Sequence, residues 1–251
     1  MRKYQPANPV DEENPYWMSF SDIMSALLVI FILAAVALMV QLMETEAELQ
    51  EKVDKLDVEI DVLQAAEKVR KTILDEAAEE LAKRGIQVIV SENDSVLRIP
   101  NDLLGFNTAA YDIQPEYRST AYSIGEVLQQ VISREDRIDY LDTIFVEGHT
   151  DNRPFNGFMG RGNWGLSTFR AISLWQYWSD ALPAQGSLQT MLNKENKSLF
   201  SVSGYGETRP VTKKQETDEE LSANRRIDIR ITIRRPKSEE IERTQTNIIE
   251  N

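Results

Sequence analysis

Asp22 is an acidic side chain at the start of a long apolar segment. Residues 23–40 contain one serine and no charge, which is close to the length needed to cross a bilayer. An ionised carboxylate at such a position costs roughly 2.5–3.5 kcal/mol on membrane-insertion scales, so lipid favours its protonated form. Asp22, helped by Ser25 one turn on, could therefore take up and release H⁺ or Na⁺. The alternative is an interfacial aspartate that only reaches water or caps the helix.

Residues 17–43 are expected to form one retained transmembrane helix, with Trp17 as an interfacial anchor. The alternatives are a buried core helix, rarely apolar on every side, and a signal peptide cleaved near residues 35–37. A lone helix cannot enclose an ion path, so partner helices would have to surround Asp22. Residues 1–16 are expected to be a cytoplasmic leader. Basic residues flanking the segment, two on each side, do not decide the orientation.

Few other side chains can carry metal or covalent chemistry. The chain has one histidine, His149, and no cysteine, which excludes thiol catalysis, cysteine-ligated metals and any site needing two imidazoles. Glu147 and Asp151 could imitate the acid pair of a glycosidase, but residues four apart on a strand seldom face one bond. The net charge of −13 argues against a nucleic-acid partner. We expect no enzyme activity, no metal and no cofactor.

Residues 44–84 contain no glycine or proline and predict a helical stalk. Six apolar residues with spacings of 7, 4, 3, 4 and 3 form an a/d seam: Leu42, Leu49, Val53, Leu56, Ile60 and Leu63. The seam favours a parallel dimeric coiled coil, and the slip after Leu63 is interpreted as a stutter. The alternative is an amphipathic helix that packs on its own domain. Gly85 is the expected helix C-cap.

Residues 85–235 predict a compact α+β domain. A hairpin is expected within residues 86–100, helices at 115–133 and 163–180, and strands around 142–151, 199–207 and 225–233. Strands that alternate with two helices in this way are typical of one packed α+β layer structure. The charged tail, residues 236–251, is expected to be disordered.

Four motifs in this domain carry a resemblance. GHTD (148–151), N-x-x-L-S-x-x-R-A (163–171), GYGExxP (204–210) and ANRRIDI (223–229) occur in the order found in the OmpA-like peptidoglycan-binding domain. The resemblance implies a βαβαββ-type fold over residues 85–235 and a site that holds diaminopimelate. The implied ligand-binding residues are Asp151, Arg170, Thr150, Asn152, Leu166, Asn163, Phe106 and Asn107.

The residue types fit that ligand. Diaminopimelate ends in an ammonium and a carboxylate. Asp151 can accept hydrogen bonds from the ammonium, and Arg170 can donate two parallel hydrogen bonds to the carboxylate. A purely structural ion pair between Asp151 and Arg170 is the alternative. For Asn163, and for Arg226 in the NRR motif, a structural hydrogen-bonding role is the favoured interpretation.

The order of leader, span with an early aspartate, stalk and OmpA-like domain resembles the B subunit of MotA/MotB-type stators. The acidic leader, YWMSFSDIMSALL at the start of the span and the unbroken stalk are more similar to ZorB of Zorya anti-phage systems. This resemblance implies an inner-membrane homodimer inside five ZorA- or MotA-like ring subunits, a cytoplasmic N-terminus and a periplasmic domain. It also implies ion transport through Asp22 and indirect coupling to cytoplasmic defence effectors. A flagellar stator subunit and a passive cell-wall tether are the alternatives.

Overall fold

The computed structural model describes residues 15–91, 93–107, 109–184, 187–237 and 240–241. Most of the predicted leader and most of the predicted tail lie outside these residues. The described residues before Val58 belong to one compact unit and those from Val58 onward to another. In the part of the tail that is described, Glu240 accepts from Arg234 (2.5 Å) and Lys237 lies 3.0 Å from Glu195.

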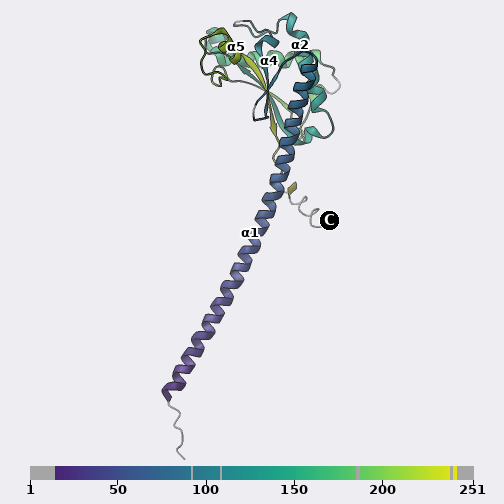
Figure 1. Ribbon diagram of the computed structural model, residues 1–251. Helices are drawn as coiled ribbons and strands as arrows, with labels where there is room; N and C mark the ends of the chain where they lie inside the picture. Colours follow the sequence, from purple (N-terminus) through teal and green to yellow (C-terminus); the bar gives the residue numbers. More distant parts are fainter. Residues whose placement is uncertain (1–14, 92, 108, 185–186, 238–239, 242–251) are drawn as a thin grey trace, which may run out of the picture. The chain divides into compact units, whose positions relative to one another are not determined.

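The first unit is helical. Helix α1 (Pro15–Lys83) has 69 residues, includes the predicted span and all but the last residue of the predicted stalk, and continues into the second unit (Figure 1). Its N-terminal segment has a mean hydropathy of 3.0 and is long and apolar enough to cross a membrane, the one such helix in the described part of the chain. The seam residues Leu49, Leu56 and Ile60 are exposed in the single chain. The predicted coiled coil therefore stays a prediction.

The second unit begins inside α1, at Val58, and not at residue 85 as predicted. Ile73, Leu74, Ala77 and Leu81 have no exposed surface and are part of the core of this unit. The C-terminal portion of α1 lies beside α2 (Arg118–Ile132; Figure 1), and Arg84, just after α1, bonds Glu126 of α2 at 2.6 Å. The change of apolar register after Leu63 therefore marks packing onto the domain. Interpreting it as a stutter was wrong.

The sheet of the second unit has five strands in the order β1-β2-β5-β3-β4. The strands are β1 (Ile89–Val90), β2 (Val96–Pro100), β3 (Leu141–His149), β4 (Phe200–Gly204) and β5 (Arg226–Ile233). Strands β3 and β4 are parallel, as expected for strands joined through a helix, and the other neighbours are antiparallel. The predicted hairpin is confirmed as β1 and β2, and the α+β class is confirmed.

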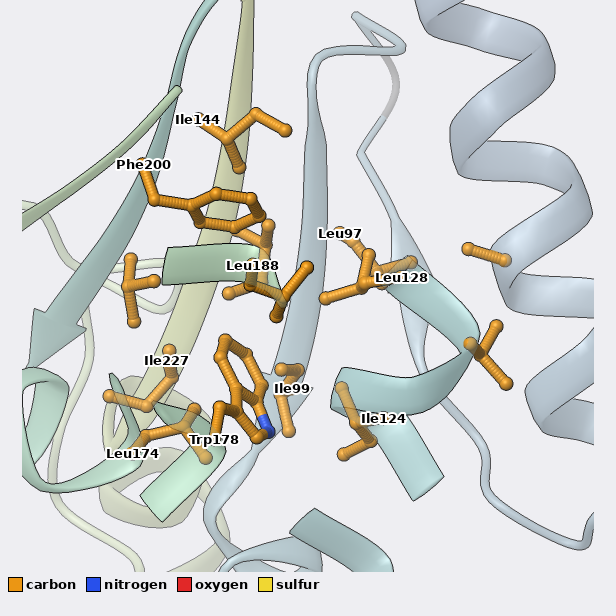
Figure 2. Packing of buried hydrophobic residues seen from close by; sticks show 14 of the residues in the cluster. Leu97, Ile99, Ile124, Leu128, Ile144, Leu174, Trp178, Leu188, Phe200 and Ile227 are labelled. Atoms are coloured by element: carbon orange, nitrogen blue, oxygen red, sulfur yellow. The ribbon is translucent and has the colours of Figure 1, made fainter. Parts of the chain in front are cut away.

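One face of the sheet carries the apolar core. Ile227, Ile229 and Ile231 alternate along β5 and are buried against α2 and α4 (Gly162–Ala181). Figure 2 shows Trp178 of α4 among Leu174, Ile227 and Ile99, and its indole N–H donates to the carbonyl of Ala121 at 2.7 Å. A buried tryptophan needs such a partner. These contacts fix α4, which supplies part of the site, against the sheet.

The opposite face of the sheet holds buried charges. Asp228 accepts from Arg226 (3.0 Å) and lies 3.2 Å from Arg98, while Glu147 accepts from Arg230 (2.8 Å). Both carboxylates are almost fully buried, so each needs these partners. Arg226 thus has the structural role favoured from the sequence.

Three short elements also belong to the second unit. They are α3 (Gly157–Gly160), the 3₁₀ segment η2 (Pro115–Tyr117) and α5 (Asp218–Asn224). Helix α5 was not predicted, although Thr217 and Glu220 form a capping box that the sequence T-x-x-E signals. It ends at Asn224, the first residue of the NRR motif, and so positions Arg225.

Candidate functional site

Asp151 and Arg170 reach one pocket from two elements. Asp151 lies two residues beyond the end of β3, and Arg170 lies on α4. Asn163, Leu166 and Arg170 are spaced at three and four residues, so they share one face of that helix. The pocket has a volume of about 130 Å³. Its lining residues are Ala109, Thr150, Asp151, Arg153, Pro154, Phe155, Asn163, Leu166, Arg170 and Arg225.

Arg170 is a buried cation that the protein holds in place without neutralising it. Only 2% of its surface is exposed. Its Nε donates to the carbonyl of Ala110 (2.8 Å) and its Nη2 to that of Asn107 (3.0 Å), while its guanidinium lies over the ring of Phe106, 5.3 Å from the centroid. Within the described part of the chain, no carboxylate lies within 4.0 Å of it. Burial, and then the charge of Arg225, lowers the pKa of Arg170 to about 10, so it remains charged at neutral pH.

Asp151, in contrast, is already paired. Its Oδ2 accepts from Nε (3.1 Å) and Nη2 (2.7 Å) of Arg153 and from Nη1 of Arg225 (2.8 Å), and its Oδ1 accepts from the backbone N–H of Arg153. Burial raises the pKa of the Asp151 carboxyl, but the hydrogen bonds from Arg153 and Arg225 outweigh it, and the net shift is downward. A direct ion pair between Asp151 and Arg170 is absent from the described residues. The alternative of a structural ion pair between these two side chains is therefore wrong.

Phe106, Asn107 and Leu166 contribute to the site in different ways. Phe106 packs under Arg170, Asn107 contributes its backbone carbonyl, and Leu166 lines the pocket. The structure thus brings these three predicted residues together with Arg170.

Thr150, Asn163 and Asn152 complete the predicted set. Thr150 lines the pocket, whereas Asn163 also donates to the carbonyls of Asp151 (3.5 Å) and Arg153 (3.0 Å), which holds the loop after β3. Asn152 is exposed, is not among the lining residues and binds Gln215 through its backbone N–H. The structure does not bring the side chain of Asn152 into the pocket.

Arg153 and Arg225 are pocket residues that sequence reasoning missed. Arg225 lies 74 residues from Asp151, and only the pairing of β3 with β5 brings the two together. The sequence did carry a signal, because Arg225 precedes Arg226 in the NRR motif and neighbouring side chains of a strand point to opposite faces. The pocket therefore sets three guanidinium groups against one carboxylate, and it is suited to a ligand with an anionic group.

His149 is not part of the pocket. It is 1% exposed, and its ring stacks on Tyr205 with the centroids 5.4 Å apart. Burial, and then the charge of Arg226, lowers its pKa to about 3, so the ring is neutral at physiological pH. It packs against Tyr205 and lies 3.5 Å from Asp228.

Asp22 and Ser25 lie three residues apart on α1, on one face of the helix. The hydroxyl of Ser25 donates to the carbonyl of Ser21 at 2.7 Å, a common bond of serine within a helix. Asp22 is exposed in the single chain. The ion-carrying role predicted for these residues remains a prediction.

Comparison with known proteins gives partial matches. No family model matches the chain. An uncharacterized protein, YtxE, of Bacillus subtilis (strain 168) is 36% identical over 86 residues, which is 34% of this chain and 31% of that protein. Motility protein B of the same organism is 34% identical over 88 residues, 35% of this chain and 29% of that protein. The match thus spans about a third of the length of each relative.

Solved structures match a larger share of the chain at lower identity. The cell wall anchor of the T6SS from Pseudomonas aeruginosa is 24% identical with a TM-score of 0.45, and the match covers 64% of this chain and 97% of that one. A putative MotB like protein from Desulfovibrio vulgaris is 18% identical with a TM-score of 0.49, and the match covers 68% of this chain and 99% of that one. The periplasmic domain of Helicobacter pylori MotB (residues 78–256) is 20% identical with a TM-score of 0.45, and the match covers 65% of this chain and 93% of that one.

Proposed function

We propose that this chain is the cell-wall-anchored subunit of an ion-driven membrane stator. The observation that carries the proposal is Arg170, a fully buried guanidinium that lines a pocket and has no carboxylate partner among the described residues. A buried, unpaired cation is costly unless a ligand neutralises it. The similarity of one segment to Motility protein B supports the same assignment.

The ligand we propose is peptidoglycan, recognised through its diaminopimelate residue. The carboxylate of that side chain would take the free hydrogen-bonding positions of Arg170, which the carbonyls of Ala110 and Asn107 already orient. The ammonium would be accepted by Asp151. The arginines and the aspartate thus match the two charges of one zwitterionic group, with Leu166 and Phe155 as apolar walls.

The motor step we propose takes place at Asp22. Protonation removes the charge of a carboxylate at the edge of the span, which changes its solvation by several kcal/mol and can bias a two-state contact with ring subunits. The ring would be five ZorA- or MotA-like subunits around a dimer of this chain, in the bacterial inner membrane with the domain in the periplasm. Anchoring to the wall would let torque act on a partner instead of spinning the complex.

Within this class we propose the ZorB role in Zorya anti-phage defence, supported by the acidic leader and the sequence of the span. A flagellar stator subunit is the second candidate, and the match to Motility protein B favours it. Plaque counts on cells that carry the chain with its neighbouring genes test the first role. Restored swimming of a stator-deficient strain would establish the second.

Asp22→Asn separates a motor from a passive tether. We expect it to abolish the function while membrane expression and binding to purified cell-wall sacculi remain normal. Asp57→Asn, an exposed acid on the same helix outside the span, is the matched control and should have no effect. Full function of Asp22→Asn would reduce the proposal to a tether. Wild-type chain that does not bind sacculi would contradict the anchoring role.

A further inference from the structure

We infer that Arg153 occupies the position at Asp151 that the ligand's ammonium takes, so that the ligand binds by displacing this side chain. The inference rests on the proposed function and concerns the same pocket. It makes Arg153 a built-in competitor that sets the affinity for diaminopimelate, in addition to the residues that contact the ligand.

Asp151 has no free position for a cation on its Oδ2. Its Oδ2 receives three N–H donors, two from the Arg153 guanidinium and one from Arg225, and its Oδ1 receives the backbone N–H of Arg153. The side chain of Asp151 is only 8% exposed. An ammonium can therefore reach Oδ2 only after one of the two guanidinium groups moves away.

Arg153 is the group that moves away. The side chain of Arg153 is 47% exposed, against 20% for that of Arg225. Arg153 belongs to the loop after β3, and its guanidinium donates two hydrogen bonds to Asp151. Arg225 lies between α5 and β5, with its backbone N–H bonded to the carbonyls of Leu221 and Ser222. The exposed arginine can turn into solvent without disturbing the fold.

Arg153 is about half exposed, and ion pairs of exposed side chains are weak, so its displacement should weaken ligand binding by roughly two- to fivefold. Arg170 lies in the same pocket but is not involved in this competition, because its donors face Ala110 and Asn107. Within the described residues Arg170 thus has no carboxylate partner to lose, whereas Asp151 must release Arg153 before its Oδ2 can accept from the ligand.

The experiment uses the full chain in lipid nanodiscs and a disaccharide-tripeptide that ends in meso-diaminopimelate. Arg153→Gln should bind this muropeptide roughly two- to fivefold more tightly than wild type in calorimetry. Arg161→Gln is the matched control, because Arg161 is exposed and its side chain has no partner among the described residues. It should leave the affinity unchanged.

A double-mutant cycle makes the test specific. In an Asp151→Asn background, Arg153→Gln should no longer improve binding, because the contact that Arg153 makes has already been weakened. Unchanged or weaker binding by Arg153→Gln, while wild type binds, would overturn the inference and leave the proposed function intact. If the wild-type chain and all variants fail to bind the muropeptide, the proposed function fails and the inference fails with it.

Discussion

The backbone of Gly148 in β3 lies directly against the carbonyl oxygen of Ser167 in α4. A Cβ atom on Gly148 would stand 1.9 Å from that oxygen, well inside van der Waals contact. Strand β3 leads to Asp151 and helix α4 carries Arg170, so this close approach sets the distance between the two halves of the pocket. The hydroxyl of Ser167 also accepts from the N–H of Gly206 at 2.9 Å, which ties the loop after β4 to the same place.

Gly148→Ala should therefore destabilise the domain and disturb the pocket. The added methyl group meets backbone, which cannot rotate away, so we expect a loss of about 3 kcal/mol in the free energy of unfolding. Chemical denaturation followed by circular dichroism measures it. Gly85→Ala is the control, since nothing lies within 4 Å of its Cβ and only its positive φ of 77° is unfavourable, at about 1 kcal/mol. Equal losses in the two variants would contradict the role of close packing.

The fold was predictable where local pattern decides it. The strict alternation of isoleucine with polar residues in β5 and the apolar face of α2 identify these elements directly. The end of the stalk was not predictable in this way. An exposed dimer seam and a helix face buried in its own domain have the same period, and only the three-dimensional contacts of Ile73 and Leu81 distinguish them.

The site was predictable in part for a similar reason. Asp151 and Arg170 were found through motifs, but their partners depend on the tertiary structure. Asp151 pairs with Arg225 across 74 residues, and Arg170 bonds backbone carbonyls some 60 residues away, which no side-chain pattern records. Residue types thus indicate the chemistry of a pocket, but only the structure shows which of its charged side chains are already paired.

Arg170→Lys should weaken muropeptide binding by roughly 10- to 100-fold although the charge is kept. An ammonium cannot donate to the carbonyls of Ala110 and Asn107 and also present a fork to a carboxylate. Calorimetry with the diaminopimelate-ended muropeptide measures the affinity, and a thermal melt establishes that the variant is folded. Arg161→Lys serves as the control, because Arg161 is an exposed arginine directly before the same helix. Near-normal affinity of Arg170→Lys would remove Arg170 from the carboxylate subsite.

The ion pair between Glu76 and Arg137 should make the packing of α1 sensitive to acid. Arg137 donates two 2.8 Å hydrogen bonds to Glu76, which lower the pKa of that carboxyl below its ordinary value of 4.5. A carboxyl with a lowered folded-state pKa stabilises the protein above pH 4.5 and loses this contribution as the pH falls through the lowered value. Glu76→Gln should cost about 1–3 kcal/mol at pH 7 and progressively less toward pH 3.

Urea denaturation at several pH values measures this difference in the free energy of unfolding. Glu79→Gln is the matched control, because Glu79 is exposed on the same helix and its pair with Lys83 is worth little. A Glu76→Gln deficit that does not change between pH 7 and pH 3 would show that the carboxylate charge is not responsible.

The exposed seam of α1 predicts a parallel dimer that single cysteines can test. Val53 and Ile60 occupy alternate seam positions with 40% and 48% of their surfaces exposed, and in a parallel dimer each faces its own copy. Val53→Cys and Ile60→Cys should form disulfide-linked dimers on mild oxidation in membranes, without background because the chain has no cysteine. Glu51→Cys, on the opposite side of the heptad, should crosslink far less. Equal crosslinking at residues 51, 53 and 60 would indicate collision between chains in place of a defined seam.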